Sequence, residues 1–205
     1  MAEQNYSIER DLKEARSMSE ALIPYIYRDE LYQTLGGSLP SLTLGALLMR
    51  LRRLRLQQNR MTKAQLDLFQ QVEAKHDAVR AEWQTHYTSK MLREAESRLN
   101  NLNTYFKECD DDPRLCANAY LPEALRRTIV QDILDEAPAE AVREAGLIAR
   151  VQKTDARMRR YVRPCGFIWD AALEAAYPET VFWWLYSRPP QPDDNGGNGD
   201  TGEEL

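Results

Sequence analysis

The chain has 205 residues, of which 43% are hydrophobic and 29% are charged. This length and composition predict one domain, or at most two small ones, with enough apolar residues for a core. The 27 basic and 32 acidic residues give a formal net charge of −5, which excludes a bulk polycation of the histone kind but allows a local basic patch.

Helical spacing of apolar residues dominates the first third of the chain. Ser7 is expected to cap a first helix, and Pro24 is expected to kink or restart that helix because proline lacks an N–H donor. The glycine pair at 36–37 ends the apolar stripe. A leucine-rich helix is then expected to begin near Pro40.

A single stripe of apolar residues runs from Leu66 to Phe106. Its eleven steps cover 40 residues, which is close to the repeat of about 3.6 residues in an α-helix. No glycine or proline interrupts the stripe. The pattern therefore predicts one long helix from about Thr62 to Glu108, which must pack along a partner helix or bend. Residues 85–89 are its weakest stretch.

Prolines divide the rest of the chain into shorter helices. The run Asp110–Pro113 is expected to end the long helix, and Pro122 and Pro138 each begin another. We expect a loop at 163–167, then a short helix and a last helix ending before Pro189. The sequence thus predicts an all-α fold, an irregular helical bundle of about six to eight helices organised around one long helix.

Domain boundaries follow from composition. Residues 1–188 are expected to form a single helical domain, with a sub-boundary near 113–121. Residues 189–205 hold five acidic residues, four glycines and three prolines, with no lysine or arginine. Such a composition is typical of a disordered acidic C-terminal tail, which either keeps the protein soluble or docks on a basic surface, its own or a partner's.

The N-terminal segment, the interrupted run 31–49 and the number of cysteines together predict a cytoplasmic protein. The polar N-terminal segment lacks the apolar stretch of a secretory signal, and glycines and a proline break the uncharged run 31–49, so no membrane span is expected. Cys109, Cys116 and Cys165 make an odd number, which argues against a disulfide framework. Buried or unreactive thiols are expected, ahead of a regulatory Cys109–Cys116 disulfide or a zinc site.

The strongest local signal is an arginine-rich segment at positions 50–60, where arginines alternate with leucines at helical spacing. Guanidinium groups bind phosphates and carboxylates well, so this segment is a candidate surface for nucleic acid, an anionic membrane surface or an acidic protein. A second group of arginines, at 157–163, could join it. The alternative is a helix face paired with the protein's own acids. The candidate binding residues are Arg50, Arg52, Arg53, Arg55 and Arg60.

Two further groups of residues are candidate sites. Glu73 and His76 have the i, i+3 spacing of a helical di-iron ligand pair, but no second copy exists, so a packing histidine is favoured and no metal or other cofactor is predicted. Aromatic residues gather near the end of the chain, where Trp183 and Trp184 point about 100° apart on a helix. They either anchor the last helix or provide a docking patch for a partner.

These observations lead to three functional hypotheses. The first is a non-enzymatic interaction or scaffold protein that acts through helix–helix contacts and self-association. The alternative is a nucleic-acid-binding accessory protein that uses the arginine-rich segment. The third is a metal-dependent enzyme built around His76 and nearby carboxylates.

Overall fold

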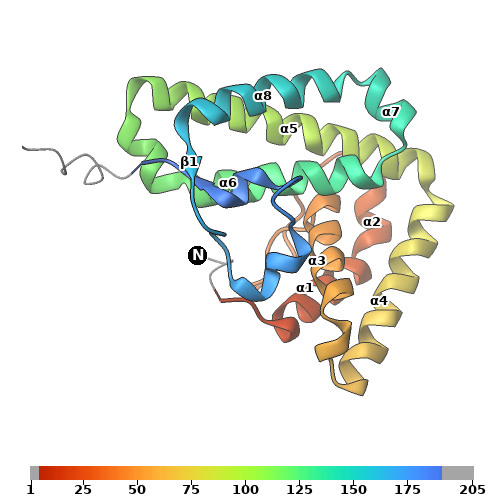
Figure 1. Cartoon of the computed structure of the whole chain (residues 1–205). Helices are drawn as coiled ribbons and strands as arrows, with labels where there is room; N and C mark the ends of the chain where they lie inside the picture. The colour runs from red at the N-terminus through yellow and green to blue at the C-terminus, as the bar shows by residue number, and fades with distance from the viewer. Residues whose placement is uncertain (1–4, 191–205) are drawn as a thin grey trace, which may run out of the picture.

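A computed structural model describes residues 5–190, and α-helices make up most of that part of the chain (Figure 1). The prediction of an all-α bundle is confirmed. The helices and short segments are α1 (Ile8–Glu20), α2 (Leu22–Tyr27), α3 (Leu44–Leu56), η1 (Gln58–Arg60), α4 (Lys63–Glu82), α5 (Gln84–Asp111), α6 (Pro113–Glu136), α7 (Ala139–Glu144), α8 (Leu147–Tyr161), β1 (Arg163–Pro164), η2 (Ala171–Ala176), η3 (Trp183–Tyr186) and β2 (Ser187–Arg188).

The helices form two layers. Helices α5, α6 and α8 lie side by side in one layer, and α1 to α4 lie below it and across its direction (Figure 1). Helix α5, the longest at 28 residues, contacts α2, α3, α4, α6 and α8, so the bundle is organised around it. Helix α3 lies beneath α5 and α6 and also contacts α1 and η2. Buried apolar residues from α1 to η3 form one continuous core.

The predicted helix from Thr62 to Glu108 does not run straight. Thr62 caps α4 as expected, because its Oγ1 accepts a hydrogen bond from the Gln65 N–H while the Gln65 side chain accepts one from the Thr62 N–H. The chain then breaks at Trp83, whose φ of −114° and ψ of 30° are not helical. Helix α5 leaves this break at a steep angle to α4 (Figure 1). The rod predicted from the sequence is therefore two helices joined by an elbow.

Other expected boundaries also differ. The stretch near 113–121 is helical, and α6 includes Pro122 beyond a kink at Ala119. Gly146, with a φ of +63°, divides the helix expected after Pro138 into α7 and α8. The last predicted helix is instead the 3₁₀ segment η3, followed by β2, which pairs antiparallel with β1 inside the expected loop. Residues 191–205, most of the predicted tail, lie outside the described part of the chain.

The segment 167–186 closes the core from one side. Its backbone carbonyls accept hydrogen bonds from elements far away in sequence, because the Tyr120 hydroxyl donates to the Trp184 carbonyl and the Gln57 side-chain amide donates to the Ala172 carbonyl at 2.6 Å. The Tyr6 N–H donates to Asp170 Oδ2 at 2.9 Å, 164 residues away. The first described residues are thus joined directly to the closing segment.

The structure also shows the state of the three cysteines and the character of the helices around the uncharged run 31–49. Cys109 at the end of α5 and Cys116 in α6 form a disulfide, which corrects the expectation of free thiols there, and Cys165 is free. The turn between α5 and α6, just before Pro113, brings these two cysteines together. An odd number of cysteines therefore did not exclude a disulfide. Within the described residues, no helix combines the length and apolar character needed to cross a membrane.

Candidate interaction surface

The elbow between α4 and α5 is held by a buried hydrogen bond. It joins His76 Nε2 on α4 to the Tyr87 hydroxyl on α5 at 2.7 Å. In one straight helix these residues, eleven positions apart, would be separated by about 16 Å along the axis. The contact therefore exists only because the chain bends at Trp83.

Burial and hydrogen bonding determine the protonation of this pair. His76 is 1% exposed, and burial lowers the pKa of its imidazole and raises the pKa of the Tyr87 phenol well above its ordinary value. The Asp77 carboxylate lies 2.9 Å from His76 Nδ1 and can only accept, so Nδ1 carries the proton. Nε2 of the neutral ring then accepts from the Tyr87 hydroxyl. The elbow is thus held by a hydrogen bond between uncharged groups.

Aromatic side chains cover the outside of the elbow. Tyr27 of α2 packs against Trp83 with ring centroids 4.7 Å apart, and both rings lie 6.4 Å from the His86 ring. Tyr27 is 57% exposed and its neighbour Ile23 is 43% exposed. We call these four residues, Ile23, Tyr27, Trp83 and His86, the elbow surface. Exposed aromatic and apolar side chains that are held in place by neighbours are typical of binding surfaces.

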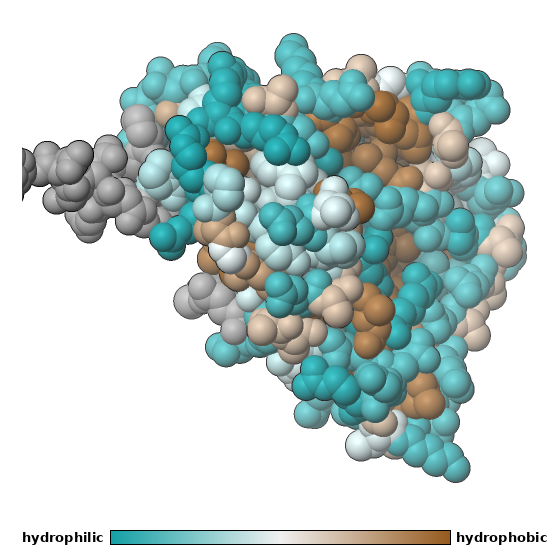
Figure 2. All heavy atoms as spheres, viewed as in Figure 1, coloured by the Kyte–Doolittle hydropathy of each residue, from teal (hydrophilic) through white to brown (hydrophobic). Residues whose placement is uncertain are grey.

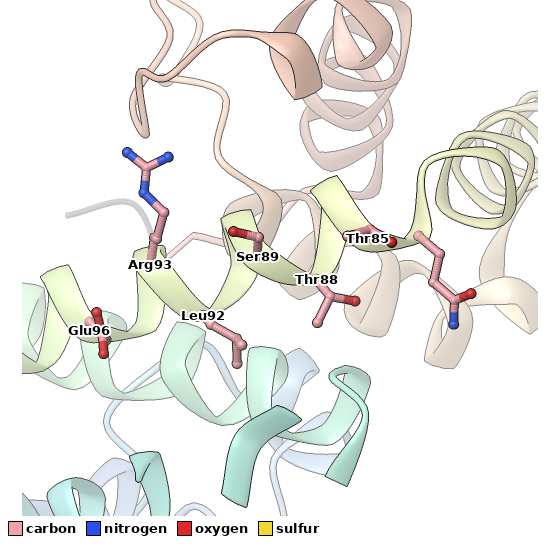
Figure 3. A pocket seen from close by; sticks show the side chains of 7 residues that line it. Thr85, Thr88, Ser89, Leu92, Arg93 and Glu96 are labelled. Carbon is pink, nitrogen blue, oxygen red and sulfur yellow. The ribbon is translucent and has the colours of Figure 1, made fainter. Parts of the chain in front are cut away.

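A shallow groove continues from the elbow surface along α5 (Figure 3). It has a volume of about 490 Å³ and is lined by Gln84, Thr85, Thr88, Ser89, Leu92, Arg93 and Glu96. The Arg93 guanidinium donates to the Asp29 carbonyl at 3.0 Å and so connects the groove to the loop after α2. We call this the α5 groove. The α5 groove places hydroxyl and charged groups beside the aromatic side chains of the elbow surface.

Sequence reasoning did not select the elbow surface. The apolar spacing places Trp83 in the stripe of a straight helix and Tyr27 in the stripe before the glycine pair. The only available signal was the weak stretch at 85–89, two residues from the observed break. The contact between α2 and the elbow could not be inferred from spacing, because it joins segments more than fifty residues apart.

Two arginines of the predicted basic surface are buried. The Arg50 guanidinium lies 2.6 Å from Glu14 of α1 and donates to the Ala46 carbonyl. Arg53 is 2% exposed, donates to the Tyr177 hydroxyl at 2.8 Å and lies over the Trp169 ring at 5.1 Å. Neither side chain is available to a large anionic partner.

The other three arginines lie nearer to solvent. Arg52 donates to Asp132 of α6 at 2.5 Å and also to Asp135, and Arg55 donates to Glu73 of α4 at 2.7 Å. Arg60 is exposed and donates to the Gln57 amide oxygen at 3.0 Å. Arg50, Arg52 and Arg55 thus pair with acids on α1, α6 and α4, as in the internally paired alternative, and the five arginines do not form one continuous positive surface.

Arg52 and Asp132 line a cleft of about 280 Å³ between α3 and α6, together with Arg55, Asp135, Glu136, Leu48 and Leu56. Asp132 is 3% exposed. Burial raises the pKa of its carboxyl to about 7, although the neighbouring Arg52 guanidinium acts in the opposite direction. Asp132 therefore titrates near neutral pH.

Replacing Asp132 with asparagine is expected to weaken the pH dependence of stability. In the folded protein Asp132 keeps its proton up to about pH 7, whereas its ordinary pKa is 3.8. Between these values the Asp132 carboxyl binds more protons in the folded state than in the unfolded state, so the contribution of Asp132 to the free energy of unfolding falls as pH rises. Urea unfolding at pH 5, 6 and 7 should therefore give wild type a more negative slope of unfolding free energy against pH than Asp132→Asn.

The matched control is Asp135→Asn, because Asp135 contacts the same guanidinium but is 42% exposed. This variant should keep the wild-type slope. Other titrating groups are common to all three proteins, so the difference between slopes isolates Asp132. Equal slopes for wild type and Asp132→Asn would contradict the assignment.

The paired tryptophans have different environments. Trp184 is fully buried, its indole N–H donates to the Thr128 hydroxyl at 2.9 Å, and the Arg127 guanidinium lies 4.0 Å from its ring centroid. Trp184 is therefore packed in the core, as in the anchoring alternative, and its ring is not exposed to solvent. Trp183 is half-buried, with the Arg159 guanidinium over its ring at 3.7 Å.

The Glu73–His76 pair does not form a shared site. Glu73 accepts from Arg55, and both ring nitrogens of His76 are hydrogen-bonded within the elbow. Across residues 5–190, no group of three or more His, Cys, Asp or Glu side chains is placed to hold a metal ion.

Comparison with known proteins identifies no relative of this chain. No protein-family model, curated protein or solved structure matches the chain.

Proposed function

We propose that this chain is a non-enzymatic interaction protein that self-associates through the elbow surface and the α5 groove. The observation that carries the proposal is the environment of Tyr27, which is 57% exposed while its ring packs at 4.7 Å on Trp83. A ring held in this way offers a large contact area with little conformational entropy left to lose on binding.

The surroundings of this ring support a protein partner. Stable interfaces combine an apolar or aromatic centre with a polar rim. Here Ile23, Tyr27 and Trp83 would form the centre, and the hydroxyls and charged groups of the α5 groove would form the rim. A second copy of the chain is the proposed partner, because two-fold dimers that use the same patch on both subunits are the commonest oligomers.

The other two hypotheses receive less support. A nucleic-acid surface at positions 50–60 would need accessible guanidinium groups, whereas Arg50 and Arg53 are buried. A metal enzyme at His76 would need a free ring nitrogen, and both are engaged in the elbow.

Sedimentation of the full chain tests the proposal. Wild-type protein is expected to have a mass above the 23.7 kDa of one chain. The double variant Ile23→Glu, Tyr27→Glu is expected to sediment as a monomer, because four charges would be buried in a two-fold contact. Both residues are exposed, so circular dichroism should show an intact fold.

The control is the double variant Leu56→Glu, Val181→Glu. These residues are 49% and 42% exposed, which matches the exposure of the elbow residues, but they belong to neither the elbow surface nor the α5 groove. This control should self-associate like wild type. A wild-type protein that remains a monomer at all concentrations, or equal dissociation of both double variants, would overturn the proposal.

A further inference from the structure

Helix α8 carries a strip of basic side chains. Lys153, Arg157 and Arg160 follow the i, i+4, i+7 spacing that places residues on one face of a helix. Lys153 and Arg160 are exposed, and no carboxylate of the described residues forms an ion pair with either. Arg157 lies 3.6 Å from Asp110 and keeps 30% of its side chain exposed. The strip is thus positive and open to solvent.

The strip borders a groove of about 460 Å³, which is lined by Asn103, Lys153, Ala156, Arg157 and Arg160. The only acidic residue of α8, Asp155, is directed to Arg127 of α6 at 2.7 Å and does not neutralise the strip. The groove contains two arginines of the basic group at 157–163, Arg157 and Arg160, together with Lys153. We call it the α8 groove.

The chain leaves the described structure beside the α8 groove. Arg188 of β2 lies opposite Arg163 of β1, two residues after the end of α8 at Tyr161. Residues 191–205 include five acidic residues and no basic ones. Fifteen residues can span up to about 50 Å, whereas α8 is about 22 Å long. The acidic residues can therefore reach every basic side chain of the strip.

We propose that residues 191–205 bind in cis to the α8 groove and compete there with external polyanions. Each exposed ion pair contributes little alone. Attachment to β2 compensates for this, because it gives the segment a local concentration in the millimolar range. The contact is electrostatic and is therefore weakened by salt.

Carbodiimide cross-linking of the full wild-type chain tests the contact directly, because it joins lysine amines to carboxylates without a spacer. Peptides that link Lys153 to the acids of 191–205 should be at least about fivefold more abundant than links to Lys63 or Lys75, given the local concentration. Both control lysines are exposed and lie on α4. The Lys153 links should disappear in about 1 M salt, where the Debye length is about 3 Å.

Isotope mixing separates the sources of these links. Links within one chain support the proposal, whereas links formed only between labelled and unlabelled chains would overturn it. An even spread of links over Lys63, Lys75 and Lys153 would also overturn it. A monomeric protein would refute the proposed self-association but leave this test intact.

Heparin chromatography tests the competition. Neutralising the five acids, by Asp→Asn at 193, 194 and 200 and Glu→Gln at 203 and 204, should raise the salt concentration needed for elution. Added to Lys153→Glu, Arg160→Glu, the neutralisation should have little effect. Added to the charge-matched pair Lys63→Glu, Lys75→Glu, it should keep its full effect. Equal effects in both backgrounds would show a response to net charge alone and overturn the proposal.

Discussion

Replacing Trp184 with alanine should lower the free energy of unfolding by about 4 kcal/mol, the range found when large aromatic residues are removed from a core. Trp184 is fully buried and its indole donates to the Thr128 hydroxyl. The alanine variant leaves a cavity and removes the partner of that hydroxyl. It also removes the ring beneath the Arg127 guanidinium. Urea unfolding of the full chain, followed by circular dichroism, measures the loss.

Trp183→Ala is the matched control because it removes the same side chain one position earlier. Trp183 is half-buried, and its ring contacts the exposed Arg159, the Trp184 ring and the edge of the core. We expect a smaller loss of roughly 2 kcal/mol, since the ring is only partly buried and its cation–π contact with Arg159 is near the surface. Similar losses in the two variants would show that Trp184 is not the anchor of the last segment.

Gly45→Ala is expected to lower the free energy of unfolding by about 2 kcal/mol. An added Cβ would lie 2.3 Å from Ile129 Cγ2 and 2.9 Å from Ile133 Cδ1, so α3 and α6 would have to separate. Overpacking of this kind costs about 3 kcal/mol, and the gain of about 1 kcal/mol from alanine in a helix offsets part of that cost. The shift would also disturb the Gly45 N–H, which donates to the buried Glu94 carboxylate at 2.9 Å.

The control is Gly166→Ala, because a Cβ at Gly166 would meet no atom within 4 Å. Its effect should stay within about 0.5 kcal/mol, as for most surface substitutions. Denaturant unfolding of the two alanine variants beside wild type makes the comparison. If Gly45→Ala were as stable as wild type, close packing would not be the reason for glycine at position 45.

The sequence predicts features that depend on neighbouring residues. Ser7 and Thr62 cap helices as expected, because a hydroxyl at this position reaches an N–H three residues later. The aspartate run before Pro113 ends α5 for an equally local reason. Capping and proline geometry act within one turn of helix, so these features can be read directly from the residues.

The elbow could not be predicted in the same way. Val79, Trp83 and Tyr87 are four residues apart, and this spacing is the same in a straight helix and in two helices that meet at Trp83. The bend is stabilised by tertiary contacts, namely the His76–Tyr87 hydrogen bond and the packing of Tyr27 on Trp83. Periodicity contains no information about such contacts.

The partners of the arginines could not be predicted from the sequence for a related reason. The balance of charges showed that internal pairing was available, but Arg52 pairs with an acid 80 residues away and Arg53 donates to a hydroxyl 124 residues away. Only the three-dimensional packing of α3 against α6 and η2 decides which groups meet. A run of basic residues therefore predicts a charged helix but not whether that charge faces solvent.

The closing segment also affects how the chain can fold as it is made. Helices α1 and α3 leave the ribosome first, but the Tyr177 partner of Arg53 is made 124 residues later, and the Asp170 acceptor of the Tyr6 N–H is made 164 residues later. Until then the Arg53 guanidinium remains hydrated and the apolar side chains around it lack their cover. The early helices therefore remain only partly assembled until the segment 167–186 has been synthesised and can pack against them.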